Sequence, residues 1–144
     1  MDSFRDILSD LVANTGLSLR QLAKESDVTA IQYSRYLRSS IPTVQITMKI
    51  AKYFDCSLDY LFGLDENKNK KKYATWEYDI SGFVDRYQQL LKDNNITNFQ
   101  FAKKSFFDES IIRHWKSGVT PRLDVVYYIA KDLGGSIDEL LGRY

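Results

Sequence analysis

Two short helices are predicted by residues 17–37, which read LSLRQLAKESDVTAIQYSRYL. Ser18 precedes Gln21 by three residues, and Thr29 precedes Gln32 by the same interval. This spacing is typical of the capping box, in which two residues exchange side-chain-to-backbone hydrogen bonds where a helix begins. Apolar residues follow each box at helical spacing. The stretch therefore predicts a helix, a short turn and a second helix.

The pattern recurs 79 positions later, because residues 17–63 align with residues 96–142 without a gap. Twelve aligned positions are identical, and many apolar positions also match apolar positions. The identical residues of the first copy are Gln21, Ala23, Lys24, Ser26, Pro42, Ile50, Ala51, Lys52, Ser57, Asp59, Leu61 and Gly63. A repeat of core and cap positions predicts one small fold built twice.

Each copy is predicted to contain five short helices and no strand. In the first copy, Gly16 ends the first helix, Pro42 breaks the chain after the third, and Ser57 caps the last. In the second copy, Thr97 begins the second helix, and Asp108 is expected to cap the third.

The two predicted domains carry almost no net charge. Residues 1–64 hold seven basic and seven acidic side chains, the linker at 65–76 holds four and two, and residues 77–144 hold nine and ten. A strongly basic domain would have indicated nucleic acid, so any contact with DNA must depend on where the charges lie. We expect an all-α protein made of these two domains and the charged, Lys-rich linker between them.

Composition and motifs also limit location and chemistry. The apolar runs are too short to span a membrane. The single Cys56, expected to be semi-buried, cannot form an internal disulfide, which fits a reducing, cytoplasmic location. No nucleophile–base pair, phosphate loop or metal cluster is visible, and the lone His114 has no companion at ligand spacing. We therefore expect no enzyme activity, cofactor or metal.

Helices two and three are expected to cross at a buried Ala23, because a small side chain lets two helices approach closely in a helix-turn-helix. A family resemblance is carried by residues 17–24, 28–29, 34–35, 42, 50–51 and 57–61 of the first copy. In the second copy it is carried by residues 100–103, 112, 115–118, 121, 129–130 and 136–140. With these residues the chain resembles two Cro/phage-repressor-type (XRE family) helix-turn-helix domains in tandem, each with a lambda-repressor-like fold. The resemblance covers nearly everything except the linker.

The resemblance implies a sequence-specific DNA-binding transcription regulator, of repressor type, whose third helix lies in the major groove of double-stranded DNA. For the first domain it implies base contacts by Ala30, Ile31, Gln32 and Arg35, and phosphate contacts by Ser18, Arg20, Thr29 and Arg38. The matching positions of the second domain are Glu109, Ser110, Ile111 and His114, with Arg113 and Lys116 nearby. Gln32 is interpreted equally as a base contact or as a residue that only closes the capping box. Core positions are expected at Tyr33, Tyr36, Ile112 and Trp115.

Two departures from the family pattern predict that the domains differ. The turn between helices two and three usually needs a positive φ, which Asp27 tolerates and Phe106 does not readily adopt. The second recognition helix is also expected to start with Asp108 and Glu109, whose carboxylates would repel phosphate. We expect the first domain to be the main DNA reader and the second to be weaker or shifted toward partner contact.

The outer face of the fourth helix is expected to differ as well. It carries Thr47, Met48, Lys49 and Tyr53 in the first domain, and Val126, Tyr127, Tyr128 and Asp132 in the second. These residues indicate either ordinary surface or a contact for a homodimer or an intramolecular pseudo-dimer. The near-neutral charge keeps an alternative function open, a non-enzymatic protein-interaction module such as an antirepressor or a phage or plasmid control component.

Overall fold

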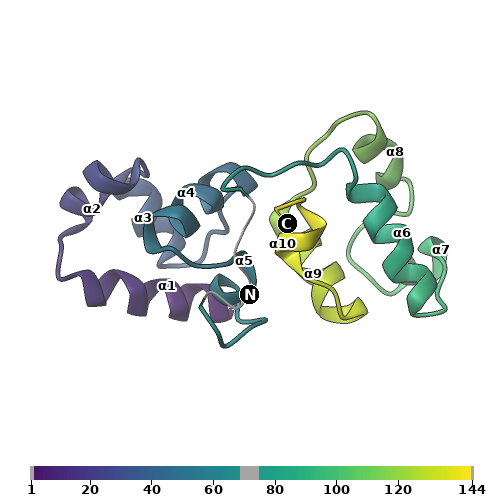
Figure 1. Cartoon of the computed structure of the whole chain (residues 1–144), viewed down its shortest axis with the longest axis horizontal. Helices are drawn as coiled ribbons and strands as arrows, with labels where there is room; N and C mark the ends of the chain where they lie inside the picture. Colours follow the sequence, from purple (N-terminus) through teal and green to yellow (C-terminus); the bar gives the residue numbers. More distant parts are fainter. Residues whose placement is uncertain (1, 69–74, 144) are drawn as a thin grey trace. The chain divides into compact units, whose positions relative to one another are not determined.

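The computed structural model describes residues 2–68 and 75–143, and these residues form ten helices and no strand (Figure 1). The predicted all-α class is therefore confirmed. The chain divides into two compact units, residues 1–72 and 73–144. Each unit contains five of the helices. The expected domain limits inside residues 65–76 stay a prediction, because residues 69–74 lie outside the described part of the chain.

The helices of the first unit begin where the sequence places caps. They are α1 (Asp2–Thr15), α2 (Leu19–Ser26), α3 (Ala30–Tyr36), α4 (Val44–Phe54) and α5 (Leu58–Leu61). Both predicted capping boxes, at Ser18 and Thr29, are present. The hydroxyl of Ser57 accepts a hydrogen bond from the Tyr60 amide, and Gly16 follows α1 with φ +68°.

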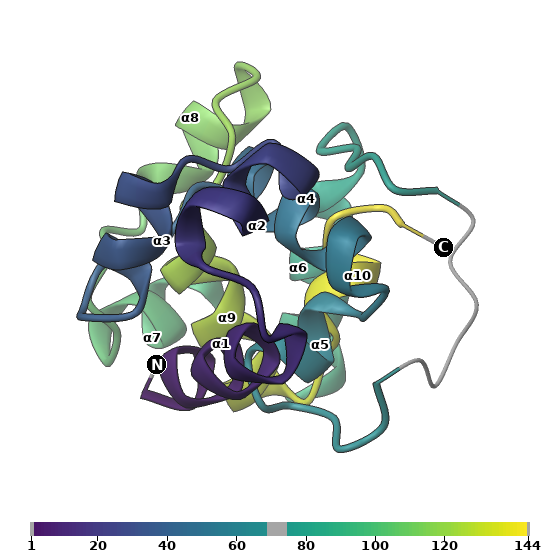
Figure 2. The same cartoon turned by 90° about the vertical axis from the view of Figure 1, so that its left-hand side faces the viewer.

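The core of the first unit is joined through α4, which packs on both α2 and α5. Helix α2 also packs on α3, and α1 packs on α5, beside which it lies in Figure 2. The rings of Phe4 on α1 and Phe62 after α5 stack at 4.7 Å between centroids. Cys56 is fully buried in this core, so the expectation of a semi-buried thiol was wrong.

A buried hydrogen bond closes α2 against α3. The Tyr33 hydroxyl donates to the Ser26 hydroxyl oxygen at 2.6 Å, and the Ser26 hydroxyl donates to the Leu22 carbonyl oxygen at 2.8 Å. Burial raises the pKa of Tyr33, so its hydroxyl stays a donor through the neutral range. Ala23 is only half-buried, so the prediction that a buried Ala23 closes this crossing was wrong. Hydrogen-bonded hydroxyl groups make the contact instead.

The second unit repeats the order of the helices. They are α6 (Phe83–Asp93), α7 (Asn98–Lys103), α8 (Ile111–Lys116), α9 (Leu123–Leu133) and α10 (Ile137–Leu140). Helices α9 and α10 match α4 and α5 residue for residue at the offset of 79. The predicted capping box at Thr97 is present.

Helix α6 organises the second unit. It packs on α7, α8, α9 and α10. The Trp115 ring of α8 meets the rings of Phe83 and Tyr87 edge to face, at centroid distances of 5.0 and 5.6 Å. Trp115 is buried as predicted, and so are Tyr33 and Tyr36 in the first unit, whereas Ile112 is half-buried.

Arg143 forms a buried ion pair and also links both ends of the second unit. The Arg143 guanidinium donates to the Asp138 carboxylate at 2.5 Å, and both side chains have zero exposure. The same guanidinium lies 4.9 Å from the centre of the Trp76 ring, and its Nε donates to the Thr75 carbonyl oxygen at 3.3 Å. The residues at the start of the unit are thereby held to the end of the chain.

The expected outer face of the fourth helix is partly wrong. Thr47, Met48 and Val126 are buried, because they lie on the core side of α4 and α9. Lys49 is exposed, and Tyr128 is half-exposed.

Removing the hydroxyl of Tyr33 should loosen α2 and α3. Because Tyr33→Phe deletes one buried hydrogen bond, we expect the free energy of opening in α2 and α3 to fall by about 1 kcal/mol. Amide hydrogen exchange of the full chain measures this. Tyr36→Phe is the matched control, since the Tyr36 hydroxyl makes no hydrogen bond within residues 2–68 and 75–143. Equal effects of the two variants would contradict this account.

Removing the cation from the buried ion pair should destabilise the second unit. Arg143→Met leaves the Asp138 carboxylate buried without its cation, and we expect the free energy of unfolding to fall by about 3–5 kcal/mol. Tryptophan fluorescence during urea unfolding reports on this unit, since it holds both Trp76 and Trp115. The double variant Arg143→Met/Asp138→Leu should recover much of the loss, because no unpaired charge remains. A single variant as stable as wild type would refute this role of the pair.

Candidate nucleic-acid interface

The turn between α2 and α3 presents α3 to solvent. Asp27 has φ +59°, the left-handed conformation that the sequence predicted for this turn, and Val28 after it is buried. Helix α3 then begins at Ala30, which is half-buried. Ile31 has 67% of its surface exposed, and Arg35 one turn later is exposed as well. An apolar and a cationic side chain therefore stand together on the open face of a short helix.

The polar side chains at the start of α3 are occupied by the backbone. The Gln32 carboxamide oxygen accepts from the Thr29 amide at 2.9 Å, and the Thr29 hydroxyl oxygen accepts from the Gln32 amide at 3.1 Å. The capping-box interpretation of Gln32 is thus confirmed. Ser18 makes the same exchange with Gln21 at the start of α2.

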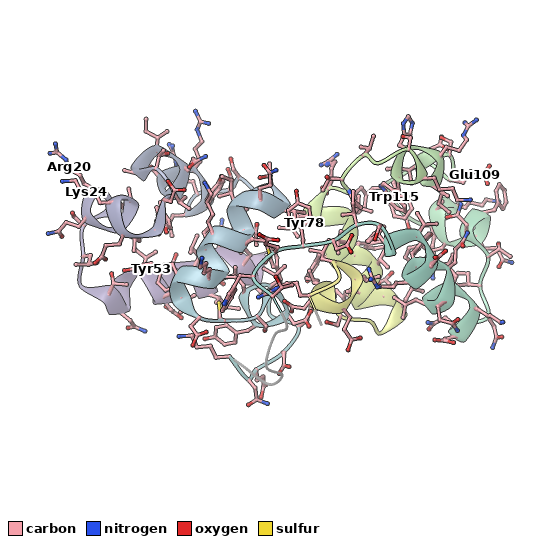
Figure 3. The ribbon with its side chains drawn as sticks, turned by 45° about the horizontal axis from the view of Figure 1, so that its top comes forward. Arg20, Lys24, Tyr53, Tyr78, Glu109 and Trp115 are labelled. Carbon is pink, nitrogen blue, oxygen red and sulfur yellow. The ribbon has the colours of Figure 1, made fainter. Side chains whose placement is uncertain are left out.

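Exposed cations surround this face of the first unit. Figure 3 shows Arg20 and Lys24 projecting outward from α2, and Arg38 is exposed at the end of α3. The Arg38 Nε donates to the Ser34 carbonyl oxygen at 3.3 Å, which limits where its guanidinium can reach. Lys24 is not among the residues predicted for the site, although it follows Arg20 by four positions and the two side chains therefore share one helix face.

The acidic residues beside these cations are held by α4. Lys49 pairs with the Asp27 carboxylate at 2.9 Å, and the Tyr53 hydroxyl donates to the Glu25 carboxylate at 2.6 Å. The Glu25 carboxylate raises the pKa of Tyr53 through this hydrogen bond. Lys49 offsets the charge of Asp27, whereas the neutral Tyr53 hydroxyl only orients the Glu25 carboxylate. The four cations Arg20, Lys24, Arg35 and Arg38 therefore outnumber the acidic residues beside them.

The corresponding part of the second unit has shorter helices and a longer turn. At the offset of 79, α7 ends two residues before α2 does, and α8 begins two residues after α3 does. Phe106 stands where Asp27 would be and does not have a positive φ, as expected for this bulky side chain. The prediction that Asp108 caps the third helix was wrong. Ser110 is the N-cap, and the Asp108 carboxylate accepts from the Ser110 amide at 2.9 Å in the preceding turn.

Two side-chain differences accompany the longer turn between α7 and α8. Ile112 stands at the position of Tyr33 and has no hydroxyl, so Ser105 donates only to the Phe101 carbonyl oxygen of its own segment, at 2.6 Å. The ion pair between Lys49 and Asp27 is replaced by two rings, Tyr128 and Phe106, 5.6 Å apart between centroids. The second unit therefore lacks both contacts that close the first turn.

The predicted site residues of the second unit do not share one helix. Glu109 and Ser110 lie in the turn, Ile111 begins α8 and is half-buried, and Arg113, His114 and Lys116 are exposed on α8. The Ser110 amide that donates to Asp108 lowers the pKa of this carboxyl group. Asp108 is thus charged at neutral pH, and the exposed Glu109 (Figure 3) follows it in the turn before the helix.

Two further properties concern the described residues 2–68 and 75–143. None of their helices is long and apolar enough to cross a bilayer. They also contain no group of three or more His, Cys, Asp and Glu side chains placed to hold a metal ion.

Comparison with known proteins identifies the class of the first unit. Residues 11–61 match a family model described as helix-turn-helix, and the match covers α2 to α5 in full. No curated protein and no solved structure matches the chain. The first unit is therefore similar to helix-turn-helix domains over these residues. This class is the DNA-binding domain of transcription regulators and is typically non-enzymatic.

Proposed function

We propose that the protein is a sequence-specific, repressor-type transcription regulator whose first unit is the main DNA reader. The observation that carries this proposal is the rigid presentation of α3, which the hydrogen bond between Tyr33 and Ser26 holds against α2 while Ile31 and Arg35 stay exposed. A helix held in this way can enter the major groove with its side chains already oriented.

The exposed side chains suit particular groups of the duplex. Arg35 matches the two acceptors on a guanine edge, and Ile31 matches the methyl group of thymine. We assign phosphate contacts to Arg20, Lys24 and Arg38, because cations at the rim of the recognition helix position a protein without selecting sequence. The remaining first-unit residues implied by the resemblance are Ser18, Thr29, Ala30 and Gln32. The amides of Ser18, Thr29 and Gln32 already donate within the capping boxes, so we assign to phosphate the amide of Ala30 at the start of α3.

We propose that the second unit is a copy of the same fold with weaker DNA contact. Its α6 to α10 follow the order of α1 to α5, but Asp108 and Glu109 place two carboxylates where phosphate would lie. Arg113 and Lys116 on α8 supply the only cations that the resemblance assigns to this surface, beside His114.

Charge reversal should separate the two units. We expect Arg35→Glu to abolish binding to a duplex selected from a random pool, and Arg113→Glu to weaken it by less than tenfold, because the second unit contributes little. Fluorescence anisotropy with labelled duplex measures both. Lys92→Glu on α6 is the control for the change in net charge. Equal losses for the two arginine variants would rule out this division.

The salt dependence of binding should report the phosphate contacts. Each cation on a phosphate adds about 0.9 to the slope of log affinity against log salt. The double variant Arg20→Ala/Lys24→Ala should therefore reduce that slope by about 2 and weaken all duplexes alike.

One alternative function is favoured by a specific observation. Residues 1–64, which hold all five helices of the first unit, have no net charge, with seven basic and seven acidic residues, which suits a protein-interaction module built on the same fold. Affinity for duplex that does not fall with salt, or no binding at low salt, would support this alternative against the proposed regulator.

A further inference from the structure

Two exposed phenyl rings distinguish the second unit from the first. Phe99 on α7 has 56% of its surface exposed, and Phe106 in the turn after α7 has 58%. The first unit has Arg20 and Asp27 at these positions. We call the surface around the two rings the phenyl patch; its other members are Lys103, Lys104, Asp108 and Glu109, which are all exposed.

A groove lies within this patch. It has a volume of about 310 Å³ and is lined by Phe99, Ala102, Lys103, Phe107, Asp108 and Glu109. The Asn98 side-chain amide donates to the Glu109 carbonyl oxygen at 3.1 Å, and the Tyr87 hydroxyl donates to the Asn98 carboxamide oxygen at 2.8 Å. These bonds tie α7 to the turn, so the two walls of the groove are held apart without an occupant.

The exposed ring of Phe106 is oriented by contacts with two neighbouring aromatic rings. It meets the Phe107 ring edge to face at 5.9 Å and the Tyr128 ring at 5.6 Å. Because these contacts orient the ring before any partner arrives, little conformational entropy is lost when it is covered. A rigid aromatic side chain beside a groove is the arrangement from which interface hot spots are made.

The charges of the patch point to the identity of the partner. Lys103 lines the groove from α7, and Asp108 and Glu109 line it from the turn before α8, while Lys104 is exposed next to Lys103. A patch with two charges of each sign does not complement the uniform negative charge of DNA. It does complement itself when two copies meet across a two-fold axis, since each residue then faces a different residue of the other copy.

We propose that the phenyl patch is a homodimer interface, in which Phe106 of each copy enters the groove of a second copy of this chain. Lys103 then lies beside Glu109 of the second copy, and the same contact occurs twice. The inference rests on the proposed function in one respect, because the dimer supplies two first units for two half-sites of an operator. The contact itself does not involve DNA.

The first unit supplies substitutions that its fold already accepts at the aligned positions. Phe106→Asp and Phe99→Arg introduce the first-unit residues Asp27 and Arg20, and the control Val119→Ser introduces Ser40. Val119 is 51% exposed in the same unit but lines no part of the groove. Sedimentation velocity of the full chain, from about 1 to about 100 μM and without DNA, should show a concentration-dependent dimer.

We expect Phe106→Asp and Phe99→Arg each to weaken dimerisation by about tenfold or more, and Val119→Ser to leave it unchanged. Thermal unfolding verifies that each variant is folded. A wild-type chain that stays monomeric over this range, or a folded Phe106→Asp variant that dimerises like wild type, would overturn the proposal.

A charge exchange tests the pairing across the two-fold axis. Lys103→Glu and Glu109→Lys should each weaken the dimer, and the double variant should restore it, because the attraction between copies is then rebuilt with the signs reversed. A double variant no better than either single variant would contradict the pairing of these two residues.

The experiment also separates this inference from the proposed function. If Arg35→Glu leaves DNA binding intact while Phe106→Asp still dissociates the dimer, the proposed function fails and the interface stands. If Phe106→Asp weakens DNA binding in a chain that is monomeric throughout, the patch contacts DNA and the interface is refuted.

Discussion

The buried hydrogen bond from Tyr33 to Ser26 is the interaction on which the arrangement of the first unit depends. It joins α2 to α3 within the helix-turn-helix, while Asp27 supplies the left-handed residue that lets the chain reverse over a short turn. Ion pairing of Asp27 with Lys49 then fastens this turn to α4. The exposed face of α3 is therefore defined by contacts on its opposite side, which is how a short helix acquires a fixed direction.

The second unit shows what the same scaffold becomes when those contacts are replaced. Its fourth and fifth helices keep the register of the repeat residue for residue, but α7 is shortened and α8 starts late. Ile112 cannot donate the hydrogen bond that Tyr33 donates, and an aromatic pair takes the place of the ion pair at the turn. Phenyl rings reach the surface as a result. One scaffold thus carries a surface suited to phosphate in one unit. In the other unit the surface carries exposed phenyl rings and charges of both signs.

Local patterns predicted the helix starts well, because a capping box at Ser18 or Thr97 involves only residues within one turn of each other. Patterns within a single sequence predicted burial and helix starts less well where these depend on side chains that are distant in the sequence. The burial of Met48 and Val126 follows from which side of α4 and α9 meets the core. The late start of α8 accompanies the contact between the Phe106 and Tyr128 rings and the missing hydroxyl at Ile112. The contacts of Arg143 with Thr75 and Trp76 join segments that no local motif connects. In the site, exposure of Arg35 was predictable, whereas the bonds that occupy Glu25 and Asp27 were not.

The central claim is that the protein meets DNA through α2 and α3 of the first unit. Titration of the ¹⁵N-labelled full chain with a selected duplex, followed by NMR, tests it most directly. The account predicts that the largest amide shifts fall within residues 18–38, and that residues 98–116 shift little. Shifts of similar size in both segments, or shifts confined to residues 98–116, would contradict it.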